Sequence, residues 1–256
     1  MNINDLSTQL LYTTVPVWGI MKDHSQVSGT GFIFSLQDEN DSSKTIPLLI
    51  TNFHVLKDIE HGMFELCTQK DGIPQKEKGI RISFDASTIQ NNKLGELDLV
   101  AIPIAATLNA ITDNVFYKSI SQDIIPDAKQ RDSFSALEEI TFIGYPSGLY
   151  DSYNKTSIIR RGITATPLWN NYQNTPTFLI DANVFPGSSG SPIFVLNQGS
   201  YATTNGITIG SRLFFVGIVT ETLVRSDTTY LNLGSAIHSY AMIPEIKKFV
   251  HRLLNH

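Results

Sequence analysis

The chain has 256 residues, of which 41% are hydrophobic and 17% are charged, a composition typical of a globular protein. Its 19 basic and 24 acidic residues give a net charge of −5, so no excess of lysine and arginine is available for nucleic acid, which we exclude as a partner. No apolar run is long enough to span a bilayer and no secretory signal is visible, so we expect a cytoplasmic protein without membrane contact. The single cysteine, Cys67, can form no internal disulfide, which is typical of a reducing compartment.

Short apolar or β-branched runs, separated by Gly, Pro, Asn and Asp, follow one another along the chain and predict an all-β protein. Twelve such runs suit two six-stranded barrels better than one small barrel. They cover residues 15–21, 31–36, 46–51, 63–68, 80–84, 97–104, 139–144, 158–166, 177–181, 192–196, 213–220 and 230–236.

The segment 107–135 is richer in polar residues and is the best candidate for a connection. We therefore predict a first barrel in 1–115, a connection in 116–135 and a second barrel in 136–243. From Pro244 onward, apolar residues recur with helical spacing and predict a terminal helix over 244–256. The polar insertion 197–212 is predicted to form a surface hairpin rather than a loop that gates a functional site.

Ser189 stands in a Gly-x-Ser-Gly-x-Pro pattern between two apolar runs. Glycines permit the tight turn that can bring a hydroxyl nucleophile and several N–H groups into one small space, as acyl transfer requires. A plain Gly/Ser/Pro turn between two strands explains the same pattern. The choice depends on whether a base and an acid accompany the serine.

His54 differs from the other five histidines because it follows an apolar run at the point where a turn or short helix begins. A structural histidine is the usual explanation of such a position, but His54 precedes both an acid and the serine pattern. Asp98 lies in the apolar run 97–104, where a carboxylate is costly to bury without a partner. A solvent-facing strand position would explain it, but we expect a buried acid paired to an imidazole N–H. Glu96 and Asp85 are weaker candidates for the acid that orients the histidine, because they lie nearer to predicted turns. No His/Asp/Glu cluster has the spacing of metal ligands, so neither a metal nor another cofactor is expected.

The order His54, Asp98, Ser189 with its flanking residues resembles the chymotrypsin-like (trypsin-fold) serine peptidases, in particular their bacterial HtrA-like branch. The matching segments are Gly-Thr-Gly-Phe at 29–32, Thr-Asn-Phe-His-Val at 51–55, Asp-Leu-Val at 98–100, Phe-Ile-Gly-Tyr-Pro at 142–146, the run 181–192 and Gly-Ile-Val-Thr at 217–220. They keep the family's order from about residue 29 to residue 240, which is more specific than any single motif.

The resemblance implies two six-stranded antiparallel β-barrels followed by a helix, with His54 and Asp98 in the first barrel and Ser189 in the second. His54 would be the base, Asp98 its orienting acid and Ser189 the nucleophile. The oxyanion segment would comprise Gly187, Ser188 and Ser189, with the N–H groups of Gly187 and Ser189 as donors.

Two departures limit what the family implies. Ser188 stands where secreted members often carry Asp, so activation by a salt bridge to a new N-terminus is not expected. Ser191 replaces a glycine. We also expect no PDZ domain.

The pocket for the residue before the scissile bond would be formed by Asn183 at its base and by Thr220, Glu221, Thr222, Gly234 and Ala236 on its walls. Without an acid at Asn183, a preference for Arg or Lys is not supported.

The sequence therefore predicts a serine endopeptidase acting on protein or peptide substrates, with control by a protein partner or a stress signal as an open possibility. The alternative is a catalytically silent peptide-binding or scaffold protein with the same fold. All three triad candidates are present, which disfavours that alternative.

Overall fold

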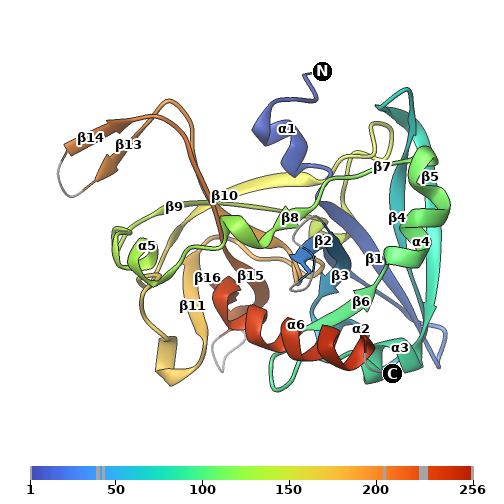
Figure 1. Cartoon of the computed structure of the whole chain (residues 1–256). Coiled ribbons are helices and arrows are strands. Elements are labelled where there is room, and N and C mark those ends of the chain that lie inside the picture. Colours follow the sequence, from blue (N-terminus) through green and yellow to red (C-terminus); the bar gives the residue numbers. More distant parts are fainter. Residues whose placement is uncertain (1, 39–40, 42–43, 204–205, 225–229, 255–256) are drawn as a thin grey trace. The chain divides into compact units, whose positions relative to one another are not determined.

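The structure, a computed structural model, describes residues 2–38, 41, 44–203, 206–224 and 230–254 (Figure 1). The chain folds into two compact units. Unit 1 comprises Met1–Gln122, Ile143–Ile158 and Pro186–Ser191, and unit 2 comprises Asp123–Phe142, Ile159–Phe185 and Pro192–His256. Within the described residues, no helix is both long enough and apolar enough to cross a membrane.

Strands make up most of the regular structure. They are β1 (Thr14–Met21), β2 (Gln26–Gln37), β3 (Thr45–Thr51), β4 (Ile59–Lys70), β5 (Ile73–Asp85), β6 (Val100–Pro103), β7 (Val115–Phe116), β8 (Ile120–Ser121), β9 (Glu139–Gly144), β10 (Ile158–Thr164), β11 (Thr177–Asp181), β12 (Pro192–Asn197), β13 (Ser200–Thr203), β14 (Gly206–Ile209), β15 (Arg212–Val224) and β16 (Tyr230–His238).

Helices are short except for the last. They are α1 (Leu6–Leu10), α2 (Phe53–Leu56), α3 (Ala86–Asn91), α4 (Ala105–Ile111), α5 (Ala128–Asp132) and α6 (Ser239–Leu254), with 3₁₀ turns η1 (Thr112–Asn114), η2 (Gln122–Ile124), η3 (Pro146–Gly148) and η4 (Tyr172–Asn174).

Unit 1 contains an eight-stranded sheet in the order β5-β4-β1-β2-β3-β6, with β7 paired to β4 and β8 paired to β2. Strand β2 is central, and its middle part from Thr30 to Phe34 is fully buried. Apolar side chains such as Ile33, Leu49 and Val100 form the core beneath the sheet. Among the described strands no pairing joins β5 to β6, so this half is an open sheet by its hydrogen bonds and the closed six-stranded barrel predicted for it is not seen.

The strands of unit 2 form a closed barrel in the order β10-β11-β16-β15-β12-β9. Phe142, Phe178 and Ile193 are among the buried residues of its core. The six-stranded antiparallel barrel predicted for the second half of the chain is therefore confirmed. Each of the twelve predicted runs overlaps an observed strand.

Helix α6 begins at Ser239, five residues before the predicted start, so Pro244 lies inside it. Proline removes one backbone hydrogen bond from a helix interior. Packing compensates, since Met242, Ile246, Phe249 and Val250 are buried, and the Ser239 hydroxyl donates to the Phe215 carbonyl at 2.7 Å. The predicted terminal helix is confirmed over residues 244–254 and begins five residues earlier, while residues 255–256 lie outside the described part of the chain.

The polar insertion predicted as a surface hairpin forms strands β13 and β14, which pair antiparallel with each other. Strands β7 and β8 were not predicted, because two residues each are too few to give a periodic pattern. The sequence-based domain limits remain a prediction.

Candidate functional site

His54 lies where strand β3 ends and helix α2 begins. Thr51 is the last residue of β3, Asn52 precedes the helix, and α2 is a single turn. Leu56 packs into the core while His54 faces solvent, with 42% of its side chain exposed. The predicted transition from a buried strand to a short helix is confirmed, and it explains why this imidazole is accessible.

Asp98 is brought to His54 by the antiparallel pairing of β3 with β6, in which Thr51 lies opposite Val100. Continuing that register places Phe53 opposite Asp98, and the Phe53 N–H donates to the Asp98 carbonyl at 3.2 Å. The Asn52 side-chain amide donates to the same carbonyl at 2.8 Å. Asn52 makes no side-chain cap of α2, the usual role of asparagine before a helix. Its amide instead holds the segment that carries the acid.

The Asp98 carboxylate binds both the backbone and the ring of His54. Oδ1 accepts from the His54 N–H at 2.8 Å, and Oδ2 lies 2.5 Å from Nδ1. Because a carboxylate can only accept, the proton of the neutral ring is held on Nδ1 and Nε2 is left as a proton acceptor. This tautomer is the one that a general base requires.

The Asp98 side chain is 35% exposed, although its apolar surroundings in the sequence suggested burial. The difference arises because Asp98 lies two residues before β6, and the continuous burial of Val100–Ile102 in that strand does not extend back to it. The two hydrogen bonds to His54, rather than burial, fix this carboxylate.

Thr30 in β2 holds the serine segment in unit 1. Its N–H donates to the Ser189 carbonyl at 2.9 Å, and its hydroxyl donates to the Gly187 carbonyl at 2.9 Å. The same hydroxyl accepts from the Tyr145 N–H at 3.0 Å, and the Thr51 hydroxyl donates to the Thr30 carbonyl at 2.7 Å. The role of Thr30 was not predicted, although a threonine between two glycines in an apolar strand was a usable signal.

Two glycines let the serine segment approach these partners. Gly190 has φ +89°, and a Cβ there would lie 1.9 Å from the Thr30 carbonyl oxygen. Gly187 has φ +85°, and a Cβ there would lie 2.6 Å from the Tyr145 carbonyl oxygen. Larger residues are excluded at both positions by backbone conformation and by space.

Gly29 brings the segment after His54 close to Ser189. A Cβ on Gly29 would lie 2.8 Å from Val55 Cγ1 and 3.4 Å from the Ser189 carbonyl oxygen. The absence of a side chain at residue 29 therefore allows α2 and the serine segment to face the same short stretch of β2. His54, Asp98 and Ser189 all belong to unit 1.

Residues 145–157 form the loop that contacts the serine segment, and this loop is tied to the unit 1 sheet. The Ser147 N–H donates to the Pro186 carbonyl at 2.5 Å. Lys155 lies 2.6 Å from the nearly buried Glu65 of β4. Burial raises the pKa of Glu65, but the hydrogen bonds and charges of Lys155 and Arg81 outweigh this and leave the pKa below its usual value.

The predicted pocket residues lie in unit 2, and several of them are neighbours. Thr222 and Gly234 are partners between β15 and β16, and the Thr222 hydroxyl donates to the carbonyl of Val184, the residue after Asn183, at 2.6 Å. Asn183 and Glu221 are exposed. The Thr220 hydroxyl donates to the Ser235 carbonyl at 3.0 Å. Gly234 and Ala236 are buried in β16.

A small cavity of about 20 Å³ lies elsewhere in unit 1, with Tyr12, Cys67 and Tyr145 among its lining residues. Its lining includes none of the three triad candidates. A space of this size holds about one water molecule, so it is not a site for a peptide.

A second His–Asp pair occurs in unit 1, where His61 and Asp85 lie opposite each other on β4 and β5 with Nδ1 3.5 Å from Oδ1. Both side chains are well exposed. This pair has the residue types of the His54–Asp98 pair without its close geometry, so it offers a matched control.

Comparison with known proteins gives one family and a set of similar folds. Residues 29–201 match the family described as the trypsin-like peptidase domain. No curated protein sequence matches the chain.

Among solved structures, the HtrA-type protease AlgW with a tripeptide is 14% identical, with a TM-score of 0.55 over 96% of this chain and 62% of that one. The chain thus spans less than two thirds of the length of the AlgW chain in that structure. AlgW with a decapeptide is 12% identical, with a TM-score of 0.52 over 98% of this chain and 68% of the other. HL collagenase is 15% identical, with a TM-score of 0.53 over 95% of each chain. At these identities the likeness concerns the fold.

Proposed function

The chain belongs to the trypsin-like peptidase domain family, and from this premise we propose that it is a serine endopeptidase in which Ser189 is the nucleophile, His54 the base and Asp98 the orienting acid. The observation that carries the proposal is the double contact of the Asp98 carboxylate with the N–H and Nδ1 of His54. It fixes the ring and its tautomer, as a base that activates serine requires.

The reaction proceeds in two steps. His54 Nε2 takes the proton of the Ser189 hydroxyl as Oγ attacks the carbonyl carbon of the scissile peptide bond, and the imidazolium then gives this proton to the leaving amine. In the second step the same nitrogen takes a proton from water as the water oxygen attacks the acyl carbon. The bond from that carbon to Ser189 Oγ then breaks, the carboxyl product leaves, and the imidazolium returns the proton to Oγ. Asp98 stabilises the imidazolium in both steps without taking its proton.

The N–H groups of Gly187 and Ser189 are the proposed oxyanion donors, and the orientation of their peptide planes supports this. The Pro186 carbonyl accepts from the Ser147 N–H, and the Ser188 carbonyl accepts from the Ser191 N–H at 3.0 Å. In a trans peptide the N–H points away from the carbonyl of the preceding residue, so these two bonds fix the directions of the Gly187 and Ser189 N–H groups. A donor fixed before the reaction needs no reorganisation when charge develops.

Peptide is the proposed substrate class, which the peptide-bound AlgW structures support. The proposed pocket comprises Asn183, Thr220, Glu221, Thr222, Gly234 and Ala236. An exposed amide at Asn183 offers no negative charge to Arg or Lys, so we expect a neutral side chain before the scissile bond. The open sheet of unit 1 is the proposed counterpart of the family's first barrel. Intracellular action and control by a protein partner belong to the same proposal.

A fluorophosphonate probe, which reacts with activated serine, tests the proposal on the intact chain. We expect labelling of the unaltered protein and its loss in Ser189→Ala and in His54→Ala. The matched controls are Ser87→Ala, at an exposed serine of α3, and His61→Ala, in the looser His–Asp pair, and both should still be labelled. A folded, unaltered protein that takes up no probe would refute the proposal and favour a silent peptide-binding protein.

A further inference from the structure

The hairpin formed by β13 and β14 is a two-stranded sheet that is separate from the barrel of its own unit. Figure 1 shows it standing away from the barrel strands of unit 2. Residues 197–211, which include the hairpin, contain no Asp, Glu, Lys or Arg. Isolated two-stranded hairpins are marginally stable in water, and natural sheets usually carry charge or proline on such edges. This hairpin has neither protection.

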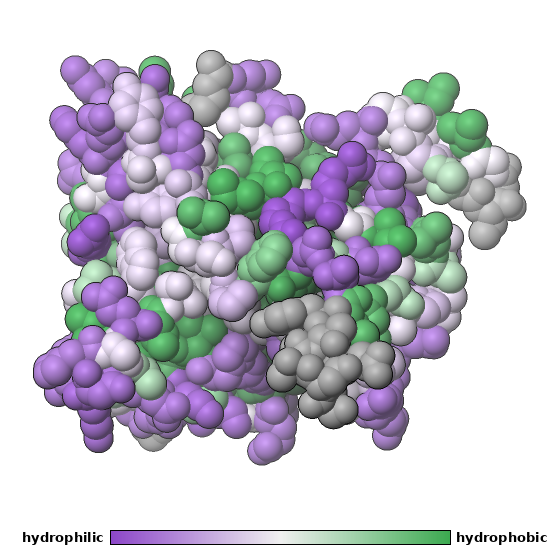
Figure 2. All heavy atoms as spheres, turned by 180° about the vertical axis from the view of Figure 1, so that it is seen from behind, coloured by the Kyte–Doolittle hydropathy of each residue, from purple (hydrophilic) through white to green (hydrophobic). Residues whose placement is uncertain are grey.

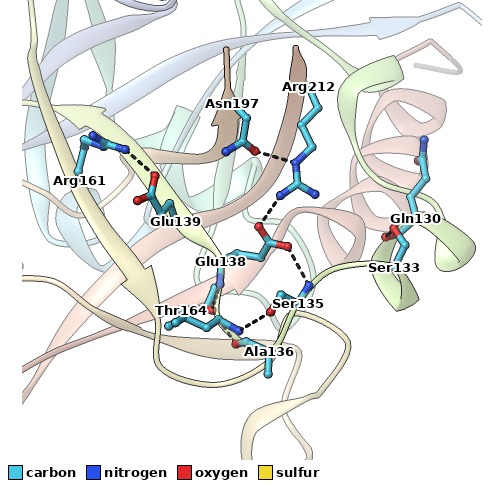
Figure 3. A network of polar contacts seen from close by, with 11 residues as sticks. Gln130, Ser133, Ser135, Ala136, Glu138, Glu139, Arg161, Thr164, Asn197 and Arg212 are labelled. Carbon is cyan, nitrogen blue, oxygen red and sulfur yellow. Dashed lines mark hydrogen bonds and ion pairs between the residues drawn. The ribbon is translucent and has the colours of Figure 1, made fainter. Parts of the chain in front are cut away.

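Polar contacts hold the base of the hairpin. Arg212 lies 2.5 Å from Glu138, with only 13% and 7% of the two side chains exposed, and it also donates to Asn197 at 2.7 Å (Figure 3). The Arg212 guanidinium stacks on the Tyr201 ring at 4.5 Å. Asn197 ends β12 and Arg212 begins β15, so both strands that lead into the hairpin are fixed to each other. The hairpin is therefore a supported projection of the barrel.

The outer edge of β14 presents unpaired backbone groups together with apolar side chains. The Gly210 N–H donates to the Gly199 carbonyl at 2.9 Å, and the register places Thr208 opposite Tyr201. Hydrogen-bonded and non-hydrogen-bonded pairs alternate along an antiparallel ladder, so the N–H and C=O groups of Ile207 and Ile209 point away from β13. Among the described strands, β14 pairs with β13 alone.

Ile207 and Ile209 also lie on one face of the hairpin, and they are 79% and 89% exposed. Figure 2 shows hydrophobic residues on this projecting part of the molecule. Exposure of two neighbouring isoleucines next to an unpaired strand edge is unfavourable in water, and pairing with another strand would cover both features at once.

We infer that β14 pairs antiparallel with β14 of a second copy of this chain, around a two-fold axis at Thr208. The segment Ile207-Thr208-Ile209 is self-complementary in this register, because Ile207 of each copy lies opposite Ile209 of the other. Both residues have outward N–H and C=O groups, so the pairing forms four hydrogen bonds. The four isoleucines then lie side by side on one face, as an isologous interface requires.

Charge and area determine how strong this pairing is. Each copy carries a net charge of −5, so the copies repel each other. Contact through the uncharged hairpin keeps most of the charged residues of the two copies at distances where salt screens their repulsion. A few strand residues bury much less than the area of a standard interface. We therefore expect a reversible dimer that forms at high protein concentration.

Cysteine cross-linking tests the register. In the proposed pairing the two Thr208 residues form a non-hydrogen-bonded pair with Cα atoms about 4.5 Å apart, which suits a disulfide. Two Ala202 residues would lie about 16 Å apart, across three strand spacings and two residues along the strands, which is too far for a disulfide. Under mild oxidation Thr208→Cys should give a covalent dimer and Ala202→Cys should not. The native Cys67 is buried in unit 1 and serves as the common background. Equal cross-linking of both variants would overturn the register.

Proline at the outer edge tests the backbone pairing. Ile207→Pro removes an outward donor from β14, and Ala202→Pro removes the equivalent outward donor from β13, while the bonds between the two strands remain. In sedimentation velocity, Ile207→Pro should weaken the dimer about tenfold, since two of four hydrogen bonds are lost, and Ala202→Pro should leave it unchanged.

A chain that stays monomeric at all concentrations, assemblies larger than dimers, or equal effects of the two prolines would overturn the inference. So would a monomer whose β14 edge takes up only an added extended peptide. Ser189→Ala should dimerise like the unaltered chain, so the inference stands or falls separately from the proposed activity.

Discussion

Replacing Thr30 by valine removes one hydroxyl from the centre of the serine segment and keeps the size of the side chain. The change leaves the Gly187 carbonyl, the Tyr145 N–H and the Ser191 hydroxyl without a partner that they now have at 2.9, 3.0 and 3.3 Å. Thr30 is fully buried, so water cannot replace these bonds without rearrangement. A lost hydrogen bond costs about 1 kcal/mol and a buried unsatisfied group somewhat more, so we expect a loss of about 2–5 kcal/mol in the free energy of unfolding.

Urea denaturation measures this loss, and Thr30→Ser is the matched control because it keeps the hydroxyl and loses only a methyl group, at about 1 kcal/mol. The valine variant should also react more slowly with the fluorophosphonate probe, by up to about 10²–10³-fold, the effect of one lost oxyanion donor. If the valine variant were as stable as the serine variant, the Thr30 hydroxyl would not hold the segment and the reasoning would be wrong.

Four further changes test other parts of the structure. Asp98→Asn should lower kcat for a peptide substrate about 10⁴-fold, because an amide can donate to Nδ1 and reverse the tautomer of His54; Asp85→Asn, in the looser pair, should leave kcat unchanged. Gly190→Ala should cost more unfolding free energy than Gly199→Ala, because both glycines have φ +89° but only Gly190 faces the Thr30 carbonyl; equal losses in urea would contradict this. Glu65→Gln should lower the free energy of unfolding by about 3 kcal/mol, because it leaves the Lys155 charge without its partner. The double variant Glu65→Gln/Lys155→Met should recover part of that loss, as measured by thermal unfolding. Burial lowers the pKa of His238 to about 4, so between pH 6.5 and 4 the unfolded chain binds a proton that the folded chain does not. The free energy of unfolding should therefore fall by about 3 kcal/mol as the pH is lowered from 6.5 to 4. In His238→Gln this part of the pH dependence should be absent, as urea denaturation midpoints at several pH values would show.

The strands could be predicted from sequence because each buries an apolar face that leaves a local pattern. Runs such as 192–196 and 213–220 show this pattern and became β12 and β15 of the closed barrel. Closure of a sheet depends on pairing between distant strands, which no local pattern encodes. For that reason the barrel of unit 2 and the open sheet of unit 1 could not be distinguished from the sequence.

The candidate site was predicted less completely than the strands. His54 and Asp98 could be found because their residue types and order are those of a known chemistry, and their contact follows from the register of β3 with β6. The burial expected for Asp98 was wrong, because the apolar run 97–104 begins three residues before strand β6 and Asp98 lies outside the strand. Asn52 and Thr30 were missed because their roles depend on backbone carbonyls of residues that are distant in the chain.

The path of the chain around Ser189 explains how the proposed nucleophile and its proposed base can belong to the same structural unit. Strands β11 and β12, on either side of the serine segment, belong to unit 2, yet Pro186–Ser191 itself is part of unit 1. The bonds responsible come from Thr30 and Ser147, which lie in unit 1 with His54 and Asp98. Chain order alone assigns the serine to the second half of the protein. Its hydrogen bonds assign it to the first, so the geometry that would activate Ser189 is set by the sheet that carries His54.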